Sequence, residues 1–128
     1  MKKILLDTNI LIWLAKGMLP PKAGGYIEDS TNTLLFSSVS IWEVAIKYGL
    51  RHKGFDIEPS LLHKELLGAG YKELPLNGKH ALLISTLPPL HKDPFDRILL
   101  AQSIYESVPI LTGDKIMAKY PSSVILAT

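Results

Sequence analysis

The amino-terminal stretch from Lys3 to Ile12 constrains the fold more than any other part of the sequence. Three aliphatic residues lead directly into Asp7, and apolar residues resume after Asn9. An unbroken aliphatic run of this kind is typical of a parallel strand that is buried on both faces. Thr8 or Asn9 can then cap a helix that follows. Asp7 is therefore expected where a central strand ends and a helix begins, which is where open α/β sheets bind ligands. The alternative is that Asp7 only takes part in the helix cap.

The rest of the chain alternates between predicted strands and predicted helices. After the strand that ends at Leu6, we expect strands at residues 33–36, 71–74, 108–112 and 123–127. We expect helices at residues 10–15, 23–30, 41–48, 59–67, 77–87 and 94–107, with a helical turn at 114–119. Such alternation predicts parallel βαβ units with helices on both faces of one sheet. The sequence therefore predicts one α/β domain over residues 1–128, with three α/β/α layers and five strands.

The composition excludes several classes of protein. With 47% apolar and 20% charged residues, the chain has the balance of a folded domain. It has no cysteine, which excludes disulfide scaffolds, thiolate zinc sites and cysteine nucleophiles. No apolar run approaches the ~20 residues of a membrane span, and Asp7 interrupts what could otherwise be a signal peptide. We therefore expect a cytosolic protein without a membrane partner, and its net charge of +2 permits a polyanionic ligand without requiring one.

A second acid, Glu43, lies on the helix predicted at residues 41–48. Ser40, Glu43 and Lys47 form one narrow polar stripe on a largely apolar segment. A mostly buried helix of this type is expected to direct its polar stripe at a polar cleft. Two structural explanations stay open: Ser40 and Glu43 have the spacing of a capping box, and Glu43 and Lys47 have the spacing of an ion pair.

A third acidic site lies in the segment His91–Arg97. Asp93 is predicted as a helix N-cap and Pro94 as the first helical residue, which places Asp96 at the third helical position. Negative charge in a first turn is favourable by about 0.3–1 kcal/mol through the helix dipole, so neither acid requires a function. We assign Asp93 to the cap and Asp96 to the chemistry.

A fourth acid, Asp114, follows an apolar strand closely, as Asp7 does. The residues Gly113 and Asp114 are also common in turns, which is the structural alternative. If the strands that carry Asp7 and Asp114 are neighbours where the strand order reverses, both acids enter one crevice.

Four carboxylates in one crevice require a counter-charge. Two like charges ~4 Å apart repel each other by about 4 kcal/mol at an effective dielectric constant near 20. An oxygen-rich site without cysteine suits Mg²⁺ or Mn²⁺ rather than zinc. Such an ion can activate water and stabilise the charge that develops on a phosphodiester. These residues therefore point to a nuclease, although spacing alone does not separate it from other phosphoryl chemistry.

The acids lie in four stretches of sequence: Leu5–Asn9, Ser40–Lys47, His91–Gln102 and Leu111–Asp114. In this order and spacing, the stretches resemble the PIN-domain nucleases, and more narrowly the VapC-like toxins of prokaryotic toxin–antitoxin pairs. The resemblance implies a Rossmann-like parallel sheet of strand order 3-2-1-4-5. It also implies RNA cleavage that depends on Mg²⁺ or Mn²⁺, a homodimer, and a small antitoxin as partner.

The resemblance also assigns roles to individual residues. The catalytic and metal-binding set would be the four acids Asp7, Glu43, Asp96 and Asp114. Polar residues would orient these acids and their waters, namely Thr8, Asn9, Ser40 and Thr112, with Asp93 as the cap. The candidates for RNA contact are Arg97, His91 and Lys92. Arg97 would pair with an acid or contact phosphate, and for His91 phosphate contact or solvation ranks ahead of metal binding.

Other functions remain open. One is a PIN nuclease of RNA processing or decay that has no antitoxin, and another is a PIN module that binds RNA or protein without cleaving. A phosphatase of the haloacid dehalogenase type is disfavoured, because it requires a second Asp where this chain has Asn9.

The other histidines, His52, His63 and His80, lack ligand spacing. Trp13 and Trp42 fit helix packing better than base stacking.

Overall fold

The sheet is built around β1 (Lys2–Leu6) in the computed structural model, which describes residues 2–50 and 54–128. Ile4, Leu5 and Leu6 are fully buried. Ile4 and Leu6 belong to one hydrophobic cluster and Leu5 to another, because successive side chains of a strand point to opposite faces. The predicted strand with two buried faces is confirmed.

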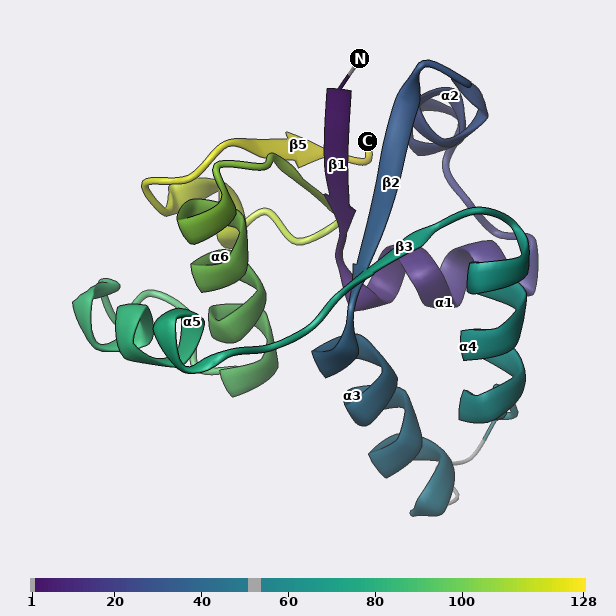
Figure 1. Ribbon diagram of the computed structural model, residues 1–128, viewed down its shortest axis with the longest axis horizontal. Coiled ribbons are helices and arrows are strands. Elements are labelled where there is room, and N and C mark those ends of the chain that lie inside the picture. Colours follow the sequence, from purple (N-terminus) through teal and green to yellow (C-terminus); the bar gives the residue numbers. More distant parts are fainter. Residues whose placement is uncertain (1, 51–53) are drawn as a thin grey trace.

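Five parallel strands lie in the order β3-β2-β1-β4-β5 (Figure 1). The other strands are β2 (Asn32–Ser37), β3 (Lys72–Leu74), β4 (Ile110–Thr112) and β5 (Val124–Leu126). The chain runs outward from β1 to β3 and then returns to the other side of β1 as β4. In register, Leu6 lies beside Phe36 on one side and Leu111 on the other, so the carboxyl ends of these three strands meet at one edge. The predicted strand order is confirmed.

Helices cover both faces of the sheet (Figure 1). One cluster holds residues of α1 (Thr8–Lys16), α2 (Pro21–Glu28) and α4 (Pro59–Gly68). The cluster on the opposite face is formed with α6 (Pro94–Glu106), and α5 (Gly78–Leu83) packs beside that helix. The helix α3 (Ser38–Gly49) begins at the carboxyl edge of the sheet and contributes a residue to each cluster. These are the three predicted α/β/α layers.

The segment between α5 and α6 differs from the prediction of one helix over residues 77–87. The α-helix ends at Leu83, and a short 3₁₀ helix, Ile84–Thr86, follows. The Ser85 and Thr86 hydroxyls donate to the carbonyls of Leu82 and Leu83, which competes with α-helical continuation. A second 3₁₀ helix covers Met117–Lys119. Within the described residues, the helices are too short or too polar to cross a membrane.

Candidate functional site

Asp7 lies at the carboxyl end of β1 and is itself the N-cap of α1. Its Oδ1 accepts a hydrogen bond of 2.7 Å from the Thr8 amide, and its Oδ2 accepts one of 2.6 Å from the Thr112 hydroxyl. The cap is therefore Asp7 rather than Thr8 or Asn9. Asp7 is 2% exposed, so both carboxylate oxygens are fixed in a buried setting.

Glu43 lies inside α3, one turn beyond its start. Because α3 begins at Ser38 and Ser37 accepts the capping bond from the Val39 amide, the capping-box explanation for Ser40 and Glu43 is wrong. The alternative ion pair is present, with 3.2 Å between Glu43 Oε2 and Lys47 Nζ.

The Ser40 hydroxyl turns toward the sheet instead of capping a helix. It forms a 2.8 Å hydrogen bond with the Thr8 hydroxyl, and both residues are buried. This bond ties α3 to the start of α1. Ser40 thereby supports the residue whose amide holds Asp7 Oδ1.

The start of α6 matches the prediction in detail. The Asp93 carboxylate accepts from the amides of Phe95 and Asp96 at 2.8 and 3.3 Å, and Pro94 is the first helical residue. Asp96 is thus the third helical residue, and its side chain is 15% exposed. Since the cap is supplied by Asp93, the Asp96 carboxylate is left to face the other acids.

These elements meet around a cavity of about 180 Å³ at the carboxyl edge of the sheet. The lining residues are Asp7, Thr8, Asn9, Ile12, Glu43, Lys47, Asp93 and Asp96. Three separate parts of the chain therefore direct acids into one small space. Asp114 does not line this cavity.

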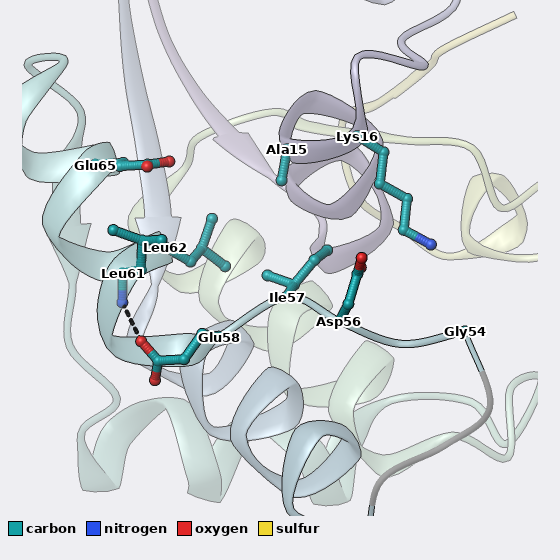
Figure 2. A pocket seen from close by; sticks show the side chains of 9 residues that line it. All are labelled: Ala15, Lys16, Gly54, Asp56, Ile57, Glu58, Leu61, Leu62 and Glu65. Atoms are coloured by element: carbon teal, nitrogen blue, oxygen red, sulfur yellow. Dashed lines mark hydrogen bonds between the residues drawn. The ribbon is translucent and has the colours of Figure 1, made fainter.

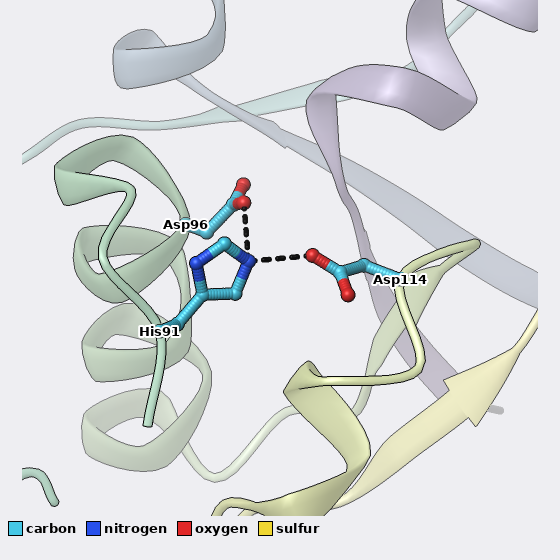
Figure 3. A group of neighbouring side chains, drawn as sticks. All are labelled: His91, Asp96 and Asp114. Carbon is cyan, nitrogen blue, oxygen red and sulfur yellow. Dashed lines mark hydrogen bonds and ion pairs between the residues drawn. The ribbon is translucent and has the colours of Figure 1, made fainter. Parts of the chain in front are cut away.

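Asp114 is joined to the cavity through His91 (Figure 3). His91 Nε2 lies 2.6 Å from Asp114 Oδ2 and 3.0 Å from Asp96 Oδ2. One ligand atom from each of the three residues lies within 4.8 Å of the others, close enough for a shared metal ion. Instead of being solvated, the His91 side chain is 13% exposed among acids. Its only sequence signal was its position next to the acidic turn.

The acids perturb one another strongly. Burial raises the pKa of Asp7 to about 6, assisted by the charges of Glu43 and Asp114 and opposed by the hydrogen bonds from Thr112 and Thr8. Burial likewise raises the pKa of Asp96 to about 8, and the charges of Asp7 and Asp93 act in the same direction. Burial and the charges of neighbouring acids therefore both disfavour the ionised form of Asp7 and of Asp96.

Opposing effects act on the pKa of His91. Burial lowers its pKa, but the hydrogen bond to Asp114 and the charges of the surrounding acids outweigh burial and raise it. The Asp93 amide, however, donates to His91 Nδ1 at 3.1 Å, which favours the neutral ring because an imidazolium has no acceptor nitrogen.

The donor set fits an oxygen-preferring divalent cation. Among residues 2–50 and 54–128, buried Glu43 Oε1 and Asn9 Oδ1 have no hydrogen-bond partner. A buried polar oxygen without a partner is unfavourable, so an oxygen ligand role would satisfy both atoms. A cation would also offset the burial of negative charge and the repulsion between acids, which together raise the pKa values of Asp7 and Asp96.

Of the residues predicted to contact RNA, Arg97 binds the protein backbone and Lys92 is exposed beside the acidic cavity. Of the two roles left open for Arg97, the ion pair with an acid is not formed within the described residues. The Arg97 guanidinium instead donates to main-chain carbonyls of Ile84, Pro88 and His91. Lys92 is exposed and lines a hollow of about 460 Å³ beside the acidic cavity. This hollow shares Glu43, Lys47 and Asp93 with the cavity.

The remaining histidines and tryptophans have separate roles. His63 pairs with Glu73, and fully buried His80 completes a capping box at α5 and contacts Glu106. His52 lies outside the described residues.

Trp13 packs against the core as predicted. Trp42, in contrast, is 53% exposed and makes an edge-to-face contact with Phe95.

Another hollow, of about 560 Å³, lies apart from the predicted site residues (Figure 2). It is formed by the carboxyl end of α1, residues of the described segment 54–58, and α4. Its lining combines apolar residues such as Ile57 and Leu62 with the charged residues Lys16, Asp56, Glu58 and Glu65. None of the predicted site residues lines it.

Comparisons with known proteins agree with this architecture. The PIN domain family matches residues 4–122. No curated protein matches the chain by sequence. The fold resembles VapBC2 from Rickettsia felis bound to a DNA fragment from its promoter, with a TM-score of 0.73 at 19% identity over 97% of this chain and 96% of that one.

Two further solved structures share the fold. DNA-bound VapBC from Salmonella typhimurium has a TM-score of 0.71 at 15% identity, with both chains fully covered. A toxin–antitoxin complex from Klebsiella pneumoniae has a TM-score of 0.68 at 21% identity, with 98% of each chain covered. At these identities the likeness establishes the fold alone. The family match, which extends over most of the sequence, shows that this chain belongs to the PIN domain family.

Proposed function

We propose that this PIN-domain protein is a divalent-metal-dependent endoribonuclease and the VapC-like toxin of a toxin–antitoxin pair. The observation that carries the proposal is the convergence of Asp7, Glu43 and Asp96 on one small cavity that also contains unpartnered buried oxygens. Membership of the PIN family supports a phosphodiester-hydrolysing enzyme. Structural neighbours that are toxin–antitoxin complexes support the toxin class.

In this proposal, the acids bind the metal ion and the hydroxyl-bearing residues position Asp7. Asp7, Glu43 and Asp96 hold Mg²⁺ or Mn²⁺, with Asp114 joined to them through His91. The bound ion supplies an activated water and stabilises negative charge on the phosphodiester. Thr8 and Thr112 fix the two oxygens of Asp7, and Ser40 fixes Thr8.

Lysines at the cavity edge would attract the RNA backbone. Lys47 lies beside Glu43, and Lys92 lines the adjoining hollow. Phosphate contacts of this kind make RNA binding weaken as the salt concentration rises. Selection of the RNA would then come from unpaired loops and shape, which proteins read more readily than paired RNA.

The direct test is cleavage of a mixed RNA pool by purified protein with Mg²⁺, Mn²⁺ or EDTA. Asp7→Asn is expected to abolish cleavage, whereas Asp56→Asn, the same chemical change on an exposed residue away from the acids, should leave it intact. Metal-dependent cleavage that is lost only in Asp7→Asn would establish the nuclease. Absence of cleavage by folded, partner-free wild-type protein would instead favour a non-cleaving binding module.

The antitoxin and the cytosolic location belong to the same proposal. A small protein encoded beside this chain should co-purify with it and inhibit cleavage when both are expressed together. If no neighbouring open reading frame encodes an inhibitor and the nuclease is active, the chain would be a PIN nuclease of RNA processing or decay.

The proposed homodimer is supported by an exposed apolar stripe on α3. Trp42 and Ile46 lie four residues apart on one face of α3, and Leu50, the C-cap residue, follows at the same spacing. The three residues are 53%, 37% and 67% exposed. A contiguous exposed apolar surface is typical of an interface. Light scattering should give a dimer for the wild-type protein and a monomer for Trp42→Glu. Leu82→Glu, at an exposed residue of α5, is the matched control that should remain dimeric.

A further inference from the structure

The side chain of Arg97 contacts the segment that leads from the 3₁₀ helix Ile84–Thr86 to α6. Arg97, in the first turns of α6, donates from Nη2 to the Ile84 carbonyl at 3.2 Å. Its Nη1 donates to the carbonyls of Pro88 at 3.3 Å and His91 at 3.5 Å. The guanidinium therefore connects the beginning, middle and end of residues 84–91. A planar group with five donors can serve several carbonyls at once, which a lysine ammonium on a flexible stem cannot reproduce.

The end of this segment is fixed by further hydrogen bonds at His91. The His91 amide donates to the Tyr120 hydroxyl at 2.6 Å, and the Asp93 amide donates to His91 Nδ1 at 3.1 Å. With Nδ1 occupied as an acceptor, Nε2 is the ring nitrogen that faces the acids. It lies within hydrogen-bond distance of both Asp114 and Asp96.

His91 thus connects two acids that the cavity does not bring together. Asp96 lines the cavity, and Asp114 lies outside its lining on the loop after β4. Both acids are directed at the same nitrogen (Figure 3). The rotamers of the two carboxylates therefore depend on the position of the imidazole, which depends on residues 84–91.

We infer that Arg97 and Tyr120 are positioning residues that act through His91 on Asp96 and Asp114. This assignment replaces RNA contact as the role of Arg97. It rests on the proposed function, because Asp96 is one of the proposed metal ligands. A partner that orients a ligand in this way typically changes metal affinity or activity by about 10–100-fold when it is removed.

The test uses Arg97→Lys, which retains the positive charge but loses the planar fork, and Tyr120→Phe, which removes one hydroxyl. Lys64→Met, at an exposed lysine of α4, is the control. The first measurement is the ¹H–¹⁵N spectrum of the His91 ring in metal-free protein, assigned with His91→Gln. Wild-type protein and the control should show one ordered tautomer with the proton on Nε2. Both positioning variants should shift these signals toward those of free histidine.

The second measurement is Mn²⁺ affinity by electron paramagnetic resonance, together with steady-state kinetics. Arg97→Lys should weaken Mn²⁺ binding about tenfold and lower kcat while the KM for RNA stays unchanged. Lys92→Met, in contrast, should raise KM and reduce the salt dependence. A rise in KM and a weaker salt dependence for Arg97→Lys, with His91 signals unchanged, would make Arg97 an RNA contact and overturn the inference.

The two proposals can fail separately. If the wild-type protein does not cleave RNA, the His91 spectra and the Mn²⁺ titration still decide the positioning role. If Arg97→Lys does not fold, Tyr120→Phe decides it, since loss of one hydroxyl leaves the Arg97 contacts in place. Unchanged His91 signals and unchanged Mn²⁺ affinity in folded Tyr120→Phe would contradict the inference for Tyr120. Arg97→Met would then be measured in the presence of a stabilising osmolyte. Unchanged His91 signals in that variant would overturn the inference for Arg97.

Discussion

Asp7 and Thr112 are 105 residues apart in the sequence, yet the Thr112 hydroxyl donates a 2.6 Å hydrogen bond to Asp7 Oδ2. The same hydroxyl accepts a bond of 3.0 Å from the Asp114 amide. One side chain at the end of β4 therefore orients Asp7 and the backbone that carries Asp114. This junction lies where the strand order reverses, the place at which α/β sheets form binding sites.

Replacement of Thr112 by Val should uncouple these two acids. The change removes one donor to Asp7 and one acceptor for the Asp114 amide while it preserves the size of the side chain. We expect Mn²⁺ affinity to fall by about tenfold or more, as for other groups that orient metal ligands. Thr112→Ser retains the hydroxyl and should bind the ion nearly as well as the wild-type protein. Equal affinities for the Val and Ser variants would contradict the proposed role of the hydroxyl.

The stability of the metal-free protein should fall as pH rises. The pKa values of Asp7 and Asp96 are raised from the ordinary 3.8 to about 6 and about 8. Between pH 4 and 8 the folded state therefore binds more protons than the unfolded chain, so the free energy of unfolding decreases with increasing pH. Their contribution is fully present below about pH 4 and is lost as pH passes through the folded values. Urea denaturation in EDTA at several pH values measures this slope.

Asp96→Asn should flatten the same slope, because it removes the carboxyl with the largest rise in pKa. It should also make the metal-free protein more stable at pH 8.5, since a buried negative charge is removed and its repulsion with Asp7 is relieved. With saturating Mg²⁺ the wild-type slope should reverse, because the ion binds the ionised carboxylates. A wild-type slope that the substitution leaves unchanged would show that other groups dominate.

Glu43→Gln separates the ligand role of Glu43 from a structural role. Glu43 does not belong to a capping box, so the substitution should leave helix content unchanged by circular dichroism. The loss of one charged oxygen should weaken Mn²⁺ binding and lower cleavage by at least about tenfold, the lower end of what a ligand partner contributes. Glu65→Gln, on an exposed face of α4, provides the same chemical change away from the cavity. Equal effects of the two substitutions would exclude Glu43 as a ligand.

Gly113 provides a test of packing behind the site. A Cβ atom at this position would lie 2.5 Å from Cη2 of Trp13 and 2.9 Å from Cζ3, closer than atoms can approach. Trp13 packs against the core, so it cannot move away freely. Gly113→Ala should destabilise the protein by about 1–3 kcal/mol, as overpacking does, and should lower activity by displacing Asp114. Gly68→Ala, where a Cβ would meet no atom within 4 Å, should not destabilise it.

Several features were predictable because their signals are local. The aliphatic run before Asp7 identified β1 as a strand with two buried faces, and the structure confirms it. The sequence of Asp93 and Pro94 predicted the cap and first residue of α6, since both depend on the backbone of adjacent residues. Five parallel strands and three layers followed from the alternation of strand and helix patterns.

The sequence left other features open or did not indicate them. The spacing of Ser40 and Glu43 resembled a capping box because sequence does not show that α3 begins at Ser38. The carbonyls that Arg97 binds became available only because residues 84–91 fold back over α6. The exposure of Trp42 depends on which face of α3 the sheet covers.

The sequence by itself determined the strands, the cap of α6, the strand order through its family resemblance, and the oxygen-rich chemistry of the acids. Only the tertiary structure decided which of those acids share a cavity, and that His91 connects Asp96 to Asp114. The physical reason is the distance along the sequence over which each effect acts. Hydrophobic periodicity and capping act over a few neighbouring residues, whereas the position of a carboxylate to within an ångström depends on packing between β1, α3, α6 and the loop after β4.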